Sequence, residues 1–194
     1  MISTPPIATA PFYGLDIETD TTVDGLDARC SAIVAIAIAT AEGDKVFLGP
    51  EHELLRRTDR LLAELNPGVI VTWNGSSFDL PFIAERAARL GMSLGLQADS
   101  ESSASRWWQH RHIDGYRLYR SDVGRTLGVS CGLKPLSRMV GLAPVEVDRT
   151  QIHMLSESQV REYVASDARL ARELVLRRMP AAMSHMDPTP SDCP

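Results

Sequence analysis

Three short motifs along this chain contain four carboxylates and one phenol. Asp16 and Glu18 are two residues apart, Tyr163 and Asp167 are four apart, and Asp79 lies between the two pairs. Residues two apart on a strand, or four apart on a helix, share a face, so each pair can serve one site. Carboxylates gathered in one pocket repel each other unless cations lie between them. Divalent ions such as Mg²⁺ or Mn²⁺ suit oxygen ligands, and two of them together can cut phosphodiester bonds. The sequence therefore predicts a metal-dependent nuclease.

The three motifs differ in how specific they are. Asp-x-Glu and Tyr-x-x-x-Asp occur often by chance, on strand edges and helix surfaces. The middle segment, Asn74-Gly-Ser-Ser-Phe-Asp-Leu-Pro-Phe82, is much rarer. It also has a purely structural interpretation, in which Asn74-Gly75 forms a turn and Asp79 caps the helix ahead of Pro81. The two interpretations are compatible, because a capping carboxylate keeps an exposed oxygen.

Composition and charge exclude several other classes of protein. The chain has 194 residues, a net charge of -5, 44% hydrophobic residues and 23% charged residues. A protein that coats duplex nucleic acid non-specifically needs a basic surface, so a histone-like role is excluded, whereas an enzyme that grips only a strand end is not. Three cysteines without CxxC spacing argue against a zinc site or a disulfide framework. Because we find no signal peptide and no apolar run long enough for a bilayer, we expect a cytoplasmic protein without a membrane partner.

Hydrophobic periodicity predicts an α/β fold in which strands come first and then alternate with helices. A tail at 1–10, one domain at 11–179 and a disordered, proline-rich tail at 180–194 are expected. Inside the domain, residues 92–106 form a serine-rich loop, and Ser156 with Gln159 forms the capping box of the last helix. The short connections around the second strand require it to run antiparallel to the first. The expected strands are 11–19, 31–40, 45–49, 69–73 and 110–114, and the expected helices are 51–65, 80–90, 115–127, 133–140 and a last one after Ser156.

The three motifs resemble those of a known family. They read Asp16-Ile-Glu-Thr19, Trp73-Asn-Gly-x-x-Phe-Asp-x-Pro-Phe and Tyr163-x-x-x-Asp-Ala. Together they are similar to the DEDD 3′-5′ exonucleases of the ribonuclease H-like superfamily, in the subgroup with tyrosine in the third motif. The sister subgroup has histidine five residues before the last aspartate, where this chain has Glu162. The likeness is closest to the proofreading exonuclease domain of family B DNA polymerases and extends from residue 11 to about 178. It implies a mixed five-stranded sheet flanked by helices.

The resemblance implies a role for each residue of the constellation. Asp16 would bridge two Mg²⁺ or Mn²⁺ ions, Glu18 and Asp167 would complete the shell of the first, and Asp79 would hold the second through water. Tyr163 would orient the attacking water, because a phenol with a pKa near 10 is a poor base at pH 7. Contacts to the terminal nucleotide are expected from the backbone of Thr19, the side chain of Asn74 and the ring of Phe78.

The expected activity is release of nucleoside 5′-monophosphates from the 3′ end of single-stranded nucleic acid, with DNA favoured over RNA. Because no polymerase segment follows, we expect a stand-alone nuclease or the nuclease subunit of a polymerase or repair partner. One alternative is an oligoribonuclease-like enzyme acting on short RNA or dinucleotides. The alternative of another class is a catalytically silent ribonuclease H-like module that binds nucleic acid or protein. The motifs leave DNA, RNA and dinucleotides open, since no residue must read a 2′-hydroxyl.

Overall fold

The computed structural model describes residues 9–98 and 105–178. The strands are β1 (Phe12–Thr19), β2 (Ile33–Ala39), β3 (Asp44–Leu48), β4 (Val69–Thr72), β5 (Leu96–Gln97), β6 (Arg106–Trp107) and β7 (His110–Asp114). The helices are α1 (Glu51–Glu64), α2 (Asp79–Arg89), α3 (Gly115–Tyr119), the π-helix η2 (Arg120–Gly124), α4 (Arg125–Leu127), α5 (Leu133–Met139), the 3₁₀-helix η3 (Arg149–Met154) and α6 (Glu157–Arg177). Apart from residues 9 and 10, the expected tails at 1–10 and 180–194 lie outside the described residues.

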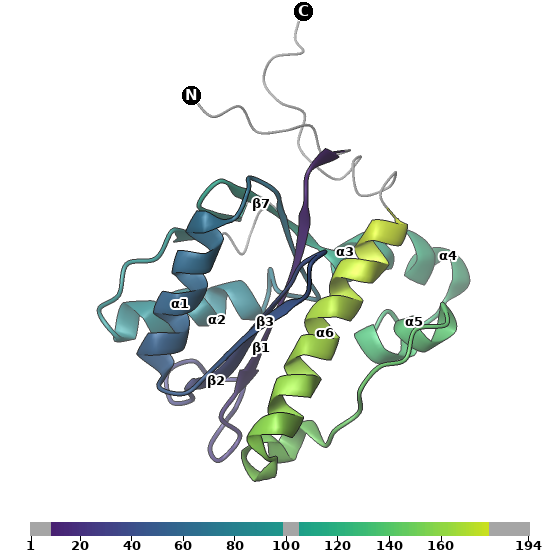
Figure 1. The fold of residues 1–194 in the computed structure, drawn as a ribbon. Helices are drawn as coiled ribbons and strands as arrows, with labels where there is room; N and C mark the ends of the chain where they lie inside the picture. The colour runs from purple at the N-terminus through teal and green to yellow at the C-terminus, as the bar shows by residue number, and fades with distance from the viewer. Residues whose placement is uncertain (1–8, 99–104, 179–194) are drawn as a thin grey trace, which may run out of the picture.

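The strands form one mixed sheet in the order β3-β2-β1-β4-β7-β6-β5, with α1 and α2 on one face and α6 on the other (Figure 1). As expected, β2 runs antiparallel to β1. Strands β1, β4 and β7 are mutually parallel. Their carboxyl ends therefore lie at the same end of the sheet, where parallel α/β sheets form their sites. Within the described ranges, no helix is both long enough and apolar enough to cross a bilayer.

Among the described residues the sheet has seven strands, so the expected number of five was wrong. The additional strands, β5 and β6, are two residues each and lie within the segment 92–106 that we expected to be a loop, apart from Trp107. Strand β6 forms a hairpin with β7, and Trp108 makes the turn with a left-handed φ of 52°. Two-residue strands carry no readable periodicity, so only their pairing defines them. Residues 99–104 of the same segment lie outside the described residues.

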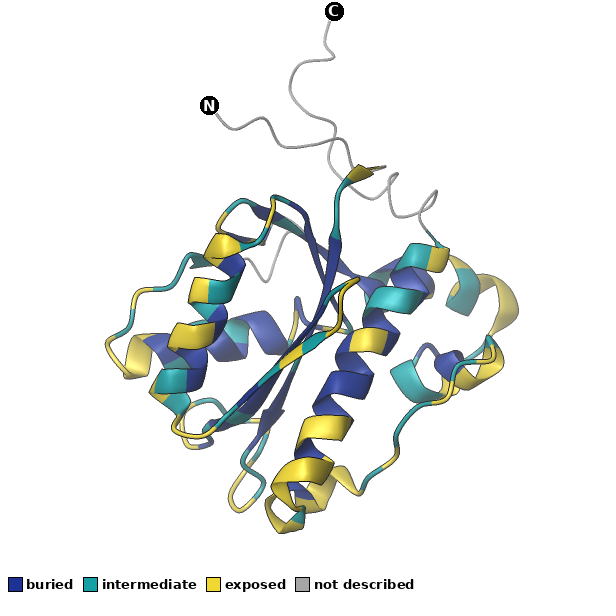
Figure 2. Cartoon of the chain, in the orientation of Figure 1, coloured by how far each residue is buried: buried dark blue, intermediate teal, exposed yellow. Residues whose placement is uncertain are grey.

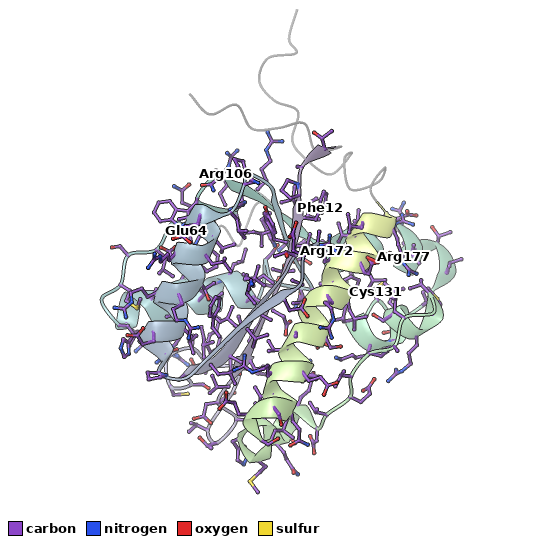
Figure 3. All side chains as sticks on the ribbon, viewed as in Figure 1. Phe12, Glu64, Arg106, Cys131, Arg172 and Arg177 are labelled. Carbon is purple, nitrogen blue, oxygen red and sulfur yellow. The ribbon has the colours of Figure 1, made fainter. Side chains whose placement is uncertain are left out.

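Helix α6 packs very closely against β1. A Cβ on Gly14 would lie 2.0 Å from the backbone oxygen of Ala168, so only glycine fits where the helix crosses the strand. Nearby, the Arg172 Nε donates a hydrogen bond of 2.8 Å to the carbonyl oxygen of Phe12, and Figure 3 labels both residues. Alanines at 35, 37 and 39 on β2 are fully buried against the same helix. Small side chains on the sheet therefore bring α6 close enough for its residues to meet those of β1.

The alternation of β1 separates its two faces. Leu15 and Ile17 are buried with α1 and α2 in one core cluster. The intervening positions, Asp16 and Glu18, point to the other face, toward α6. Helix α6 starts at the expected capping box, in which Ser156 and Gln159 satisfy each other's backbone. Its buried stripe faces the sheet (Figure 2) and carries the second pair of predicted site residues.

Candidate active site

Three of the four predicted carboxylates meet between β1 and α6. One oxygen each from Asp16, Glu18 and Asp167 lie within 4.8 Å of one another. In β2, Ala37 and Ala35 pair with Asp16 and Glu18, and their short side chains take up little space beside the two carboxylates. The register between β1 and β2 shifts directly after Glu18, an irregularity of the kind that re-aims side chains next to sites.

Asp79 lies at the edge of this cluster rather than within it. Hydrogen bonds to its carboxylate from the backbone of Ile17 and of Asp79 itself tie it to the end of β1. Its charge nevertheless raises the pKa of both Asp16 and Glu18, so it faces the same site. The alternative, structural interpretation of Asp79 as an N-cap was wrong: Phe78 is the N-cap of α2, without a side-chain hydrogen bond, and Asp79 is the first helical residue.

Another carboxylate, that of Asp114 at the end of β7, stabilises the turn that precedes Asp79. Its Oδ1 accepts from the amide of Asn74 at 3.0 Å and its Oδ2 from the amide of Ser76 at 3.1 Å. Asn74 adopts a left-handed φ of 68°, a conformation that costs less for asparagine than for most residues. The same carboxylate caps α3 through the amide of Tyr116 at 3.0 Å. The turn was predicted, but the residue that stabilises it was not identified as part of the site.

The cluster is short of positive charge. Burial first, and then repulsion from Asp167, Glu18 and Asp79, raise the pKa of Asp16 well above its usual range. Burial raises the pKa of Glu18 to about 8 and that of Asp79 to about 7. Without a cation Glu18 therefore keeps its proton near neutrality, and Asp79 keeps it in part. Because every donor is a carboxylate oxygen, the set fits a hard divalent ion such as Mg²⁺ or Mn²⁺.

Tyr163 is next to the cluster, one helical turn before Asp167. Its side chain is hydrogen-bonded to the Asp167 carboxylate. Burial, followed by the charge of Asp167, raises the pKa of the phenol above its ordinary value. The hydroxyl therefore stays protonated at neutral pH, where it can donate a hydrogen bond but cannot act as a base.

Two cations at the site were missed by the sequence analysis. Lys134 of α5 donates to Asp167 Oδ1, and its Nζ lies 4.4 Å from the centroid of the Tyr163 ring. The positive charge of Arg149, at the start of η3, partly offsets the rise in pKa of all four carboxylates. Both lie outside the three motifs and reach the site only through folding. The one available sequence signal was that Lys134 is one of two lysines in a chain with eighteen arginines.

A cavity of about 470 Å³ opens beside Glu18. Two of the three predicted substrate contacts, Thr19 and Phe78, line it together with Arg149. Asn74 is exposed and is not among the lining residues, so its contact to a nucleotide stays a prediction. The remaining walls come from Ile17, Glu18, Thr21, Val23, Asp24, Gly25, Leu26 and Thr150.

The loop between β1 and β2 closes one side of this cavity. Thr21 Oγ1 and His153 Nδ1 are 2.8 Å apart and connect the loop to η3, while Thr19 Oγ1 donates to the carbonyl of Gly25 at 2.6 Å. Val23 and Leu26 expose apolar side chains on the same loop. The cavity thus combines an apolar rim with the charge of Arg149 and borders the carboxylate cluster at Glu18.

The chain is similar to family B DNA polymerases in part of its sequence. Residues 31–111 match the model of the DNA polymerase family B exonuclease domain. A catalytic chain of DNA polymerase epsilon from Arabidopsis thaliana is 34% identical over 126 residues, 61% of this chain and 6% of that protein. DNA polymerase 1 of Pyrococcus abyssi is 33% identical over 101 residues, 46% of this chain and 13% of that protein. The chain therefore spans only a small part of the polymerases it matches.

The fold extends the likeness to almost the whole chain. The family B DNA polymerase from the hyperthermophilic archaeon Pyrobaculum calidifontis superposes with a TM-score of 0.76, over 94% of this chain and 26% of that chain, at 20% identity. At that identity the match concerns the fold alone. In sequence over part of its length, and in fold over nearly all of it, this chain resembles the exonuclease domain of family B DNA polymerases, a domain of the DEDD type with a ribonuclease H-like fold.

Proposed function

We propose that this domain is a metal-dependent 3′-5′ exonuclease that removes nucleoside 5′-monophosphates from the 3′ end of single-stranded nucleic acid, with DNA favoured. The observation that carries the proposal is the meeting of Asp16, Glu18 and Asp167, from β1 and α6, within 4.8 Å. Carboxylates so close together are costly unless a cation is bound, and one of them, Glu18, lines a cavity, which supports a functional site here. The preference for DNA is supported by the similarity to DNA polymerases.

Each residue has a role that follows from its surroundings. Asp16, Glu18 and Asp167 would hold a divalent ion, and Asp79 would hold a second at the edge of the cluster. Bound divalent ions supply activation of water and stabilisation of the departing oxygen. Tyr163 is protonated and next to Asp167, so its hydroxyl would donate a hydrogen bond that orients the attacking water. Arg149 would offset the charge of the scissile phosphate.

The cavity beside Glu18 supports attack at a chain end rather than within a chain. Its volume of about 470 Å³ lies in the range of pockets that hold one small ligand, so it has room for a terminal nucleotide. The β1–β2 loop closes it at Val23 and Leu26, where the terminal base would find apolar contacts. Thr19 and Phe78 would then face the sugar and the base.

The test is a panel of labelled substrates: single-stranded DNA, single-stranded RNA and dinucleotides, each with Mn²⁺, with Mg²⁺ and with a chelator. We expect stepwise shortening from the 3′ end of DNA that the chelator abolishes and that Asp16→Ala lacks. Preferential cleavage of dinucleotides or short RNA would favour the oligoribonuclease-like alternative. Binding of the same strands without cleavage under any metal would contradict the proposal and favour a silent module.

A further inference from the structure

Lys134 contacts the carboxylate cluster at Asp167. Its Nζ donates to Asp167 Oδ1, and its side chain is only 17% exposed. The same Nζ lies 4.4 Å from the ring centroid of Tyr163, within the range of a cation–π contact. It therefore touches both functional residues of α6, although it belongs to α5.

The charge of Lys134 extends beyond the residue that it contacts. Its Nζ forms an ion pair with Asp167 Oδ1, and Asp167 has an oxygen within 4.8 Å of oxygens of Asp16 and Glu18, so the ammonium is also close to these two carboxylates. The ammonium thus supplies part of the positive charge that the cluster lacks. A divalent ion at the same carboxylates must compete with it for an oxygen of Asp167 and is repelled by it at close range.

The choice of lysine at this position is informative. The chain has eighteen arginines and only two lysines, Lys45 and Lys134. A guanidinium grips a carboxylate with two parallel hydrogen bonds, whereas an ammonium is a point charge on a flexible stem that exchanges partners easily. Lysine therefore suits a cation that has to leave Asp167 when a metal ion arrives.

We propose that Lys134 is a built-in competitor of the divalent ion, which holds Asp167 in the ion-free protein and lowers its affinity for metal. This inference rests on the proposed function, because it takes Asp16, Glu18 and Asp167 as metal ligands. It assigns Lys134 a positioning role through Asp167, with no direct part in the chemistry. Its consequence is that removing the ammonium tightens metal binding.

The experiment is calorimetric titration of the substrate-free protein with Mn²⁺ at one pH near neutrality. Lys134→Met should bind Mn²⁺ roughly tenfold more tightly than wild type, because a like charge leaves the site while all the carboxylates stay. Lys134→Arg, which keeps the charge, should not bind more tightly than wild type. Lys45→Met, at the exposed position 45 on β3, is the matched control and should leave the affinity unchanged.

The sign of the change separates this role from the others. If Lys134 only fastened Asp167 in place, Lys134→Met would bind Mn²⁺ more weakly, and if it were a bystander the affinity would not change; either result overturns the inference. Lys134→Gln, with its fold checked by circular dichroism, serves as the second neutral variant if the methionine variant does not fold. Asp16→Ala tests the site itself: unchanged Mn²⁺ binding in that variant would refute the proposed metal site rather than the role of Lys134.

Discussion

Replacing Asp114 with alanine tests how the site holds the turn in front of Asp79. The carboxylate accepts hydrogen bonds from the amides of Asn74, Ser76 and Tyr116, at 3.0, 3.1 and 3.0 Å. Hydrogen bonds to a charged group contribute roughly 1.5–3 kcal/mol each and are not additive. The amides of Asn74 and Tyr116 belong to residues that water can reach, so only Ser76 would leave a buried amide without a partner. We therefore expect a loss of about 3 kcal/mol in the free energy of unfolding.

Urea denaturation measures this loss directly. With a slope of about 2 kcal/mol per molar urea, the midpoint should fall by about 1.5 M. Exonuclease activity below the transition should fall by roughly 10²-fold, because small displacements of a catalytic group cost about that much. The urea midpoint and the activity of Asp114→Asn should lie between those of wild type and Asp114→Ala, since one acceptor oxygen remains.

Asp44→Ala is the matched control for Asp114→Ala. Asp44 lies on the edge strand β3 and forms an ion pair with the exposed Arg169 of α6. Such a surface pair contributes about 1 kcal/mol or less. An Asp114→Ala protein with the urea midpoint and the activity of the Asp44→Ala control would refute the assignment of Asp114 as the residue that stabilises this turn.

Three further predictions concern the cluster and its support. Tyr163→Phe should keep metal binding in calorimetry but lower the cleavage rate roughly 10²–10³-fold, the usual cost of one oriented hydrogen bond in a transition state, whereas Asp16→Ala should lose both; a wild-type rate in Tyr163→Phe would contradict its place beside the attacking water. Burial raises the pKa of Glu18 from 4.5 to about 8, so the folded metal-free protein holds this proton more tightly than the unfolded chain does. Its contribution to stability is therefore complete below about pH 4.5 and is lost as the pH rises through about 8; melting temperatures without metal should fall across that window, and Mn²⁺ should raise them more at pH 8 than at pH 6. Gly14→Ala should lower the melting temperature strongly, because the new Cβ would lie 2.0 Å from the carbonyl oxygen of Ala168; an unchanged melting temperature would mean that α6 can shift freely.

Local sequence determined the elements that carry the motifs. The first strand and the capped last helix follow from short-range patterns: alternation on β1, and the Ser156–Gln159 capping box with an apolar stripe on α6. These patterns also determined that Asp16 and Glu18 share one face, and that Tyr163 and Asp167 share another. Spacing along one element depends only on its backbone geometry, so it can be read without knowing the fold.

Tertiary structure decided how the elements meet and what surrounds the carboxylates. The last two positions in the sheet are taken by two-residue strands that exist only because β6 pairs with β7 and with β5. Asp79 lies at the edge of the cluster because the end of β1 holds it there. Lys134 and Arg149 come from segments without a motif, and Lys134 is thirty-three residues from the aspartate that it contacts. Contacts of that kind depend on packing between distant segments, which local sequence patterns do not specify.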